Sequence, residues 1–331
     1  MRIGLLGVGR LGASHAETLR SLPQVERLVI YDADRARAVD VATHVGAEAV
    51  DSIDAAFRGV DTVVIVTPTD THAALIKKAV DAKLAVFCEK PVAIGLGETK
   101  DLVSYVARAR GRVQIGFQRR FDAGYNAARG ELRGGTLGSV YSFYMTSRDR
   151  LPPPDAYIKT SGGQFKDQAI HDFDITRWLF DDEVDEVIAM GSTLGHPTYD
   201  GMGDVATSAV TLRLRGGALG AILAARHNEA GYDIRVEINC AKDTIAIGLD
   251  TRTPLRSVER DAPRLAGPAY PSFFVRFGQA YREELAYFLR FARGEAENAC
   301  TVEDGLEALR IAEAAGLSWR EHRPVPLRDI A

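Results

Sequence analysis

Roughly the first 118 residues alternate short apolar runs with stretches of helical spacing. The apolar runs predict five strands, at Ile3–Leu6, Leu28–Tyr31, Thr62–Val66, Ala85–Cys88 and Val113–Phe117. Helical patterns lie between them, as at Ala13–Ser21 and Ala73–Ala82. Short, nearly continuous apolar strands are typical of a parallel sheet buried on both faces. The alternation therefore predicts an α/β fold with a doubly wound parallel sheet.

The pattern changes at about residue 121, where polar and apolar positions begin to alternate along longer runs. Helices are predicted at Tyr125–Arg133, Asp167–Leu179, Phe273–Arg293 and Val302–Arg320, and strands at Val140–Thr146, Val205–Leu214, Ala218–Ala225, Ile234–Asn239 and Thr244–Gly248. Half-apolar strands with Gly216-Gly217 at a turn indicate antiparallel hairpins. We expect residues 1–120 to form one domain, and residues 121–331 an α+β domain with a large, mainly antiparallel open sheet.

Composition narrows the classes of function. The chain has 331 residues, 46% of them hydrophobic, and a net charge of −4. This balance argues against a nucleic-acid partner, because such proteins usually carry basic patches. The sequence has no apolar stretch near the ~18 residues that span a membrane. Three widely spaced cysteines (Cys88, Cys240 and Cys300) favour a reducing compartment, the cytoplasm, over a disulfide framework or a zinc site.

A glycine pattern follows the first predicted strand and begins the first helix. Gly7-Val8-Gly9-Arg10-Leu11-Gly12 is a G-x-G-x-x-G, in which the glycines permit a tight turn, close approach of a pyrophosphate and helix–sheet packing. Asp32 lies twenty residues beyond Gly12, where a carboxylate accepts hydrogen bonds from the adenosine ribose. These residues predict a dinucleotide site. Asp32 favours NAD over NADP by repelling a 2′-phosphate, although Arg35 and Arg37 lie close enough to offset it.

Polar residues follow two further strands. Thr67-Pro68-Thr69-Asp70-Thr71-His72 comes after the third long strand, and Glu89-Lys90-Pro91 after the next. Ligands of open α/β sheets bind at the carboxyl ends of strands, so both turns are candidates for contact with the cofactor. The first turn can also be interpreted as a proline turn that caps the next helix. Lys90 can be interpreted as an ordinary solvated lysine.

These motifs, in this order, resemble the Gfo/Idh/MocA oxidoreductase family, and most closely its inositol 2-dehydrogenases. The resemblance rests on Gly7–Gly12 followed by His15, Thr67-Pro68 with His72, Glu89-Lys90-Pro91, and the segments Gly116–Asp122 and Gly162–Asp174. It covers essentially the whole chain. It implies a Rossmann domain for NAD and a C-terminal domain that binds a polyol and assembles a homo-tetramer or homo-dimer through its sheet.

Asp167 and His171 are spaced i, i+4, which places them on one face of a helix, where a carboxylate raises the basicity of an imidazole. Alone, the pair is as easily a surface ion pair. The resemblance implies that Lys90, Asp167 and His171 form the catalytic set. Either His171 or Lys90 then serves as the base for the hydroxyl proton.

The resemblance also implies two sets of binding residues. The cofactor set comprises Gly7, Val8, Gly9, Arg10, Leu11, Gly12, Asp32, Arg37, Thr67, Pro68, Thr69, His72, Glu89, Lys90 and Gln118. The substrate set comprises Lys90, Arg120, Asp167, His171, Asp174 and Tyr232. An equally good interpretation of Tyr232 is an aromatic residue of a strand that packs on the sheet and does not bind substrate. The sequence has no HExxH and no cysteine–histidine cluster, so we expect no metal.

The function predicted is oxidation of a ring hydroxyl of myo- or scyllo-inositol to a ketone, with hydride transfer to NAD. The alternatives are a dehydrogenase of another sugar, an NAD-dependent glycosidase without net redox change, and a non-catalytic dinucleotide-binding regulator. Lys90, Asp167 and His171 argue against the regulator, because a non-catalytic protein has no need of them.

Overall fold

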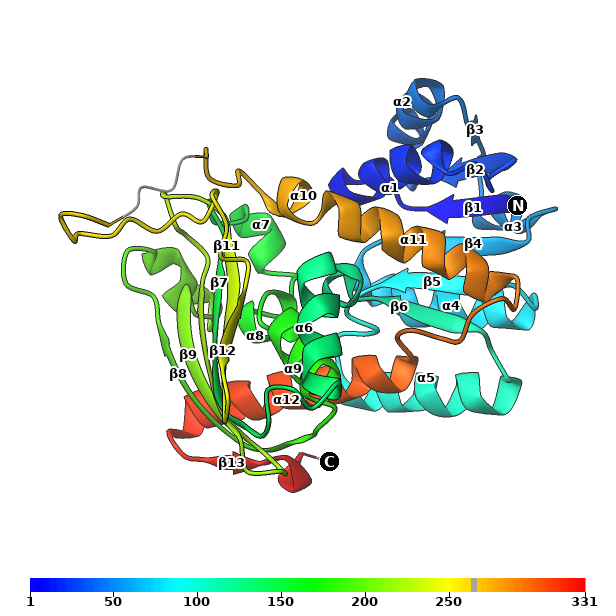
Figure 1. Cartoon of the computed structure of the whole chain (residues 1–331). Coiled ribbons are helices and arrows are strands. Elements are labelled where there is room, and N and C mark those ends of the chain that lie inside the picture. The colour runs from blue at the N-terminus through cyan, green and yellow to red at the C-terminus, as the bar shows by residue number, and fades with distance from the viewer. Residues whose placement is uncertain (263–266, 331) are drawn as a thin grey trace. The chain divides into compact units, whose positions relative to one another are not determined.

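The computed structural model describes residues 1–262 and 267–330. The chain forms two compact units (Figure 1). Unit 1 comprises Met1–Phe121 and Gln279–Glu307, and unit 2 comprises Asp122–Gly278 and Ala308–Ala331. The segment 279–307, which the sequence pattern assigned to the C-terminal domain, therefore belongs to the same compact unit as the first sheet.

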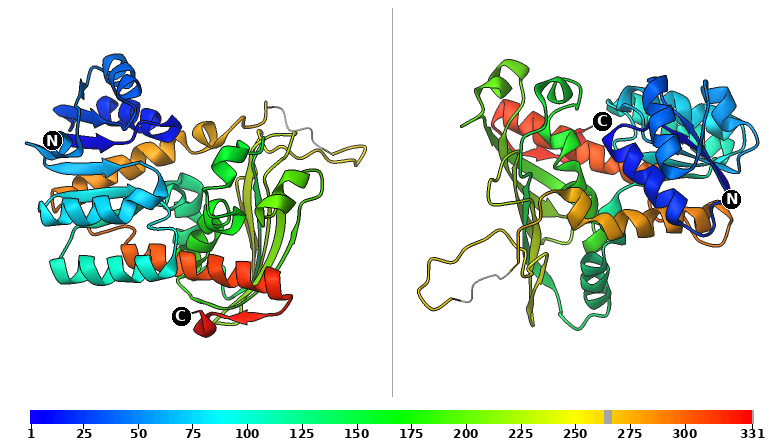
Figure 2. Two further views of the ribbon diagram at one scale, coloured as in Figure 1. Left: turned by 180° about the vertical axis from the view of Figure 1, so that it is seen from behind. Right: turned by 90° about the horizontal axis from the view of Figure 1, so that it is seen from above.

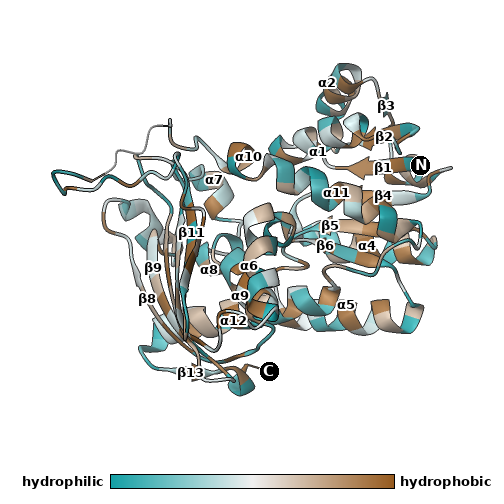
Figure 3. Ribbon diagram, viewed as in Figure 1, coloured by the Kyte–Doolittle hydropathy of each residue, from teal (hydrophilic) through white to brown (hydrophobic). Residues whose placement is uncertain are grey.

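Unit 1 contains a six-stranded parallel sheet in the order β3-β2-β1-β4-β5-β6. Its strands are β1 (Arg2–Leu6), β2 (Arg27–Tyr31), β3 (Glu48–Ala49), β4 (Thr62–Ile65), β5 (Ala85–Glu89) and β6 (Val113–Gly116). Every side chain of β4, β5 and β6 is buried, and Figure 3 shows hydrophobic residues along the strands of this sheet. The predicted doubly wound sheet is confirmed. Its strand order changes direction between β1 and β4, which is where such sheets bind ligands.

The helices of unit 1 include one from the C-terminal part of the chain. They are α1 (Arg10–Ser21), α2 (Arg35–Val45), α3 (Ile53–Phe57), α4 (His72–Asp81), α5 (Leu96–Ala109) and α11 (Gly278–Ala292), with short 3₁₀ turns η1 (Thr69–Thr71) and η2 (Gln118–Phe121). Leu285 and Phe288 of α11 share a core cluster with Leu5 and Phe87 of the sheet. The rings of Phe87 and Phe288 lie 5.5 Å apart. Full burial of such side chains contributes about 1.5–3 kcal/mol each, so α11 is part of the core of unit 1.

Unit 2 contains a seven-stranded sheet in the order β12-β11-β7-β10-β9-β8-β13. Its strands are β7 (Val140–Arg148), β8 (Val184–Ser192), β9 (Thr207–Leu214), β10 (Leu219–Ala225), β11 (Asp233–Cys240), β12 (Thr244–Ile247) and β13 (Val325–Pro326). Neighbouring strands pair antiparallel, except that β7 and β10 are parallel. The predicted mainly antiparallel sheet is confirmed.

Buried and exposed side chains alternate along β9 and β10, as expected for a sheet covered on one face. The helices of unit 2 are α6 (Ala123–Arg133), α7 (Asp155–Ile158), α8 (Gln164–Asp167), α9 (Ile170–Phe180), α10 (Phe273–Arg276) and the part of α12 (Val302–Glu321) from Ala308 onward, with 3₁₀ turns η3 (Pro197–Met202) and η4 (Leu327–Asp329). Figures 1 and 2 show α6, α8, α9 and the later part of α12 against the same face of the sheet.

Two predicted helices are interrupted. The helix expected at Asp167–Leu179 is divided into α8 and α9, because the Ala169 amide bonds to the Gln164 carbonyl and widens the turn. The helix expected at Phe273–Arg293 is divided at Phe277 into α10 and α11.

Candidate active site

The turn between β1 and α1 has the geometry of a dinucleotide site. Gly7 has φ +87°, and a Cβ at Gly12 would lie 2.1 Å from the Gly7 carbonyl oxygen, so both positions require glycine. A Cβ at Gly9 would meet nothing within 4 Å, which leaves open space beside the start of α1. No side chain caps that helix start, so its amide groups remain available to an anion. These features fit the pyrophosphate of a dinucleotide.

Asp32 follows β2 and stabilises the turn between β1 and α1. Its Oδ2 accepts a hydrogen bond from the Val8 amide at 2.7 Å, and its Oδ1 accepts one from the Asp34 amide at 2.8 Å. The guanidinium of Arg37 lies 3.5 Å from Asp32 and 3.2 Å from Asp34, while Arg35 pairs with Asp51. Both cations that the sequence places near Asp32 are therefore engaged with carboxylates, which leaves less positive charge for a 2′-phosphate.

The turn after β4 is held by His72 and two threonines. Thr67 and Thr71 share a hydroxyl–hydroxyl bond of 2.6 Å. His72 is buried, with Nδ1 2.8 Å from the Pro91 carbonyl and Nε2 2.8 Å from the Thr67 carbonyl. Burial lowers the pKa of His72, although these two carbonyls act in the opposite direction. His72 thereby links the turn after β4 to the residue that follows Lys90.

The end of β5 presents Glu89 and Lys90. The Glu89 carboxylate is buried and lies 2.7 Å from Nε2 of His15, which is itself buried in α1. A Cβ at Gly116 would come within 3.1 Å of this carboxylate, so the strand beside it requires glycine for close packing. Lys90 is half-buried at the carboxyl edge of the sheet. The buried contact between His15 and Glu89 therefore joins α1 to the end of β5, just before Lys90. This contact was not predicted from the sequence.

Gln118 and Arg120 lie in η2, directly after β6, and both are buried. Nη1 of Arg120 donates to the Ala299 carbonyl at 2.8 Å, and its guanidinium pairs with Asp304 at 3.3 Å. In unit 1, Arg120 thus anchors Ala299, just before α12, and Asp304, in the first turn of α12.

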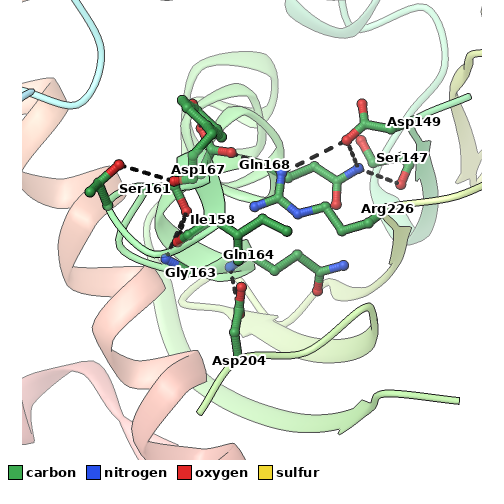
Figure 4. A network of polar contacts seen from close by, with 12 residues as sticks. Ser147, Asp149, Ile158, Ser161, Gly163, Gln164, Asp167, Gln168, Asp204 and Arg226 are labelled. Atoms are coloured by element: carbon green, nitrogen blue, oxygen red, sulfur yellow. Dashed lines mark hydrogen bonds and ion pairs between the residues drawn. The ribbon is translucent and has the colours of Figure 1, made fainter. Parts of the chain in front are cut away.

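The second group of candidate residues lies on α8 and α9 in unit 2. Gly163, with φ +88°, precedes α8. The Asp204 carboxylate accepts hydrogen bonds of 2.8 Å from the amides of Gln164 and Val205, so it caps this short helix from a different part of the chain (Figure 4). Because Asp204 fixes the start of α8, it also fixes where Asp167 lies.

Both carboxylate oxygens of Asp167 accept hydrogen bonds from side chains outside its own helix. Oδ1 accepts from the Tyr157 hydroxyl and Oδ2 from Nη1 of Arg226, each at 2.8 Å. Gln168 and Asp149 continue the same network (Figure 4). The sequence reading did not predict Tyr157 or Arg226. The available signal was an arginine directly after the apolar run that forms β10.

His171 is half-buried in the first turn of α9. Gln168, between the two helices, has φ −92° and ψ −57°, and Ala169 has φ −70° and ψ −17°. Since both residues keep right-handed helical dihedrals, Asp167 and His171 remain about one turn apart although the helix is divided.

The other substrate-side candidates are buried. Asp174 is 1% exposed on α9. Tyr232 is 7% exposed, and its ring lies edge-on to Phe277 at 6.4 Å, with Phe273 at 6.5 Å. These ring contacts support the packing role of Tyr232, one of the two roles that we predict from the sequence.

Within residues 1–262 and 267–330, no three histidine, cysteine, aspartate or glutamate side chains are arranged to hold a metal ion. No helix in the described part of the chain is long and apolar enough to cross a membrane.

Comparison with known proteins decides the family. A profile of the Gfo/Idh/MocA oxidoreductases with an NAD-binding Rossmann fold matches residues 1–117, and the profile of that family's C-terminal domain matches residues 125–246. The chain belongs to the Gfo/Idh/MocA oxidoreductase family. The predicted resemblance, the oxidoreductase class acting on CH–OH and the NAD cofactor are thereby confirmed.

Relatives in the Gfo/Idh/MocA family match nearly the full chain. Myo-inositol 2-dehydrogenase of Thermotoga maritima is 35% identical and covers 100% of this chain and 99% of its own. scyllo-Inositol 2-dehydrogenase (NAD(+)) of Bacillus subtilis is 34% identical, covering 99% and 96%. A crystal structure of scyllo-inositol dehydrogenase from Lactobacillus casei, with NAD(H) and scyllo-inositol bound, superposes with a TM-score of 0.88 at 27% identity and covers 99% of each chain.

Proposed function

We propose that this chain oxidises a ring hydroxyl of a cyclitol, myo- or scyllo-inositol, to a ketone. The observation that carries the proposal is the full-length match to relatives named as inositol 2-dehydrogenases. The polar segment of α8 and α9 adds support, because a polyol needs several donors and acceptors to fix one hydroxyl for reaction. NAD, when bound, supplies the hydride acceptor.

The proposed catalytic residues are Lys90 from unit 1 and Asp167 and His171 from unit 2. His171 accepts the hydroxyl proton, since a neutral imidazole has a ring nitrogen that can accept a proton, whereas an ammonium group has none. The Lys90 ammonium donates a hydrogen bond to the developing alkoxide. Asp167 orients His171 and stabilises its protonated form, as expected from a carboxylate one helical turn away.

The proposed binding roles follow the two units. Residues 1–120 bind the dinucleotide and residues 121–331 bind the polyol. The cofactor set comprises Gly7, Val8, Gly9, Arg10, Leu11, Gly12, Asp32, Arg37, Thr67, Pro68, Thr69, His72, Glu89, Lys90 and Gln118. In the substrate set, Asp174 and Tyr232 join the catalytic residues and Arg120. His72, Glu89 and Arg120 are engaged with protein partners, so their contribution is to hold the backbone that meets the ligand.

Asp32 is proposed to select NAD. We expect Asp32→Ala to lower kcat/KM with NAD by about 10- to 100-fold, the equivalent of a lost charged hydrogen bond, and to raise the NADP-to-NAD ratio of kcat/KM. Asp32→Asn keeps an acceptor oxygen without the charge and separates the two effects. Steady-state kinetics with both cofactors measures the ratio. If the ratio is unchanged in both variants, Arg37 or another group sets cofactor choice.

We propose that the chain forms a homo-tetramer or homo-dimer through the exposed face of the seven-stranded sheet in unit 2. Leu219 and Ile188 are large, exposed apolar residues on that face, and the strand register aligns Tyr144, Ala221, Thr211 and Ile188 across it. Exposed apolar surface of this kind marks interfaces.

Leu219→Glu tests the interface. We expect it to shift the molar mass by light scattering to that of a smaller species, because a charge on this face would be buried on assembly. Leu255→Glu is the matched control, since Leu255 is equally exposed but lies outside the sheet. A Leu219→Glu protein with unchanged mass would exclude this face.

We also propose a cytoplasmic location, because three widely spaced cysteines, none of them in a CxxC pair, favour a reducing compartment.

The function is tested by absorbance of reduced nicotinamide with purified protein, NAD or NADP, and a panel of inositol isomers and aldoses. We expect reduction of NAD with myo- or scyllo-inositol at rates above those with any aldose. Reduction with an aldose alone would assign another sugar as substrate. No reduction across the panel, with NAD bound, would favour a non-redox glycosidase or a regulator.

A further inference from the structure

Arg226 is a buried cation at the end of β10. Its side chain is 3% exposed, and Nη1 lies 2.8 Å from Oδ2 of Asp167 and 3.8 Å from Oδ2 of Asp149. A guanidinium removed from water is stable only when carboxylates compensate the loss of hydration. Burial lowers the pKa of Arg226, but Asp167, Asp149 and Asp204 together raise it above its ordinary value, so the group is charged.

Tyr157 contacts Asp167 from another side of the network. It lies on α7, after the proline-rich loop, and is 48% exposed, yet its hydroxyl donates to Oδ1 of Asp167. Arg226 takes the other oxygen of the same carboxylate. The orientation of Asp167 is therefore set by two donors from outside α8, one of them positively charged.

Several carboxylates surround the guanidinium of Arg226. Asp149 and Asp204 lie near Arg226 on other segments, and Gln168 donates to Asp149 at 3.0 Å. Arg226 forms an ion pair with Asp167, and its guanidinium also lies near the other two carboxylates. Without Arg226, the carboxylates would repel one another at a site with little water, and Asp167 would tend to take up a proton or turn away.

We propose that Arg226 is a positioning residue for the reaction, which, with Tyr157, fixes the orientation and the negative charge of Asp167. This inference rests on the proposed role of Asp167 in orienting His171. Arg226 acts through Asp167 and makes no direct contribution to proton or hydride transfer.

Arg226→Gln removes the charge and retains much of the side-chain volume. We expect kcat with inositol to fall by about 10- to 100-fold, because small misplacement of a catalytic group costs up to about 100-fold. KM for NAD should stay within about twofold, since Arg226 belongs to unit 2. Arg226→Lys keeps the charge without the planar fork, and we expect it to recover part of the lost kcat.

Tyr157→Phe provides a variant with little risk to folding, because the ring is half-exposed and only the hydroxyl is lost. We expect a smaller fall in kcat, about threefold to tenfold, as for one neutral donor lost to a charged acceptor. Arg177→Gln is the control. It also breaks an arginine–carboxylate pair in unit 2, in which Nε of Arg177 lies 2.7 Å from Oε2 of Glu183. We expect this variant to keep kcat within about twofold of wild type.

Double mutants with Asp167→Asn separate positioning from a purely structural role. If Arg226 and Tyr157 act through Asp167, adding Arg226→Gln or Tyr157→Phe to Asp167→Asn changes kcat by less than about threefold, although each is harmful alone. Additive losses would overturn the inference.

Two further outcomes distinguish this inference from the proposed function. If Asp167→Asn is inactive while folded Arg226→Gln and Tyr157→Phe have normal kcat, the positioning role is wrong and the catalytic role of Asp167 stands. If Asp167→Asn is itself fully active, the catalytic role of Asp167 and the inference both fail. Should Arg226→Gln not fold, Tyr157→Phe and Arg226→Lys still decide, because normal kcat in both contradicts the inference.

Discussion

Replacing His171 by alanine is expected to lower kcat for inositol oxidation by at least about 100-fold while NAD still binds. General-base catalysis by a positioned imidazole contributes about 10²- to 10⁴-fold, and the variant leaves only water to take the hydroxyl proton. His171 lies in unit 2, and the glycine turn and Asp32 lie in unit 1, so the dinucleotide contacts are kept. Steady-state kinetics and NAD binding by fluorescence titration measure the two effects.

His44→Ala is the control for His171→Ala. His44 is an exposed histidine on α2 whose ring lies 3.5 Å from Glu17, and its loss should leave kcat within about twofold. Partial rescue of His171→Ala by added imidazole would support the proton-transfer role. A His171→Ala enzyme with kcat within about threefold of wild type would contradict the assignment of the base.

Lys90→Ala is expected to cause a loss of similar size, at least about 100-fold in kcat, because one donor to a developing oxyanion is worth about 10²- to 10³-fold. Lys90 is half-buried at the carboxyl end of β5, and that strand end is held through Glu89 and His15, which the substitution leaves in place. The fold of unit 1 should therefore be unchanged, as circular dichroism would verify.

Lys90→Arg tests whether charge alone is sufficient at this position. An arginine keeps the charge but places it at a different distance and in a planar fork, so we expect only partial recovery of kcat. Lys78→Ala is the matched control, since Lys78 is an exposed lysine of the same unit that pairs with Asp54. Normal turnover by Lys90→Ala would remove Lys90 from the catalytic set.

The parts of the fold that the sequence predicted are those set by local patterns. Near-continuous apolar runs identified β1, β2, β4, β5 and β6, because strands buried on both faces need apolar residues at every position. The two-residue strand β3 and the strand β8 were not predicted, since short or half-polar segments carry little periodic signal.

Long-range pairing was beyond what the sequence indicates. The parallel pairing of β7 with β10 depends on contacts between residues far apart in the chain. The place of α11 in the core of unit 1 has the same origin, because its apolar face predicts burial without naming the partner.

The residues of the candidate site likewise fall into those that the sequence predicts and those that it does not. The glycine turn and Asp32 could be predicted because their roles depend on residues next to one another in the chain. The contacts of Asp167 with Tyr157 and Arg226 could not, because Arg226 is distant in sequence and its position after an apolar run does not indicate which carboxylate it meets. The same holds for His72, whose ring joins two turns, and for the bond between His15 and Glu89.

The proposed reaction is net oxidation of a cyclitol ring with transfer of its hydride to NAD. The most direct test uses myo-inositol and scyllo-inositol deuterated at the ring carbons, with mass spectrometry of the reduced nicotinamide and of the product. We expect one deuterium in each reduced nicotinamide and one ketone formed per NAD consumed. Product formation without net NAD reduction, or reduced nicotinamide without deuterium, would contradict it.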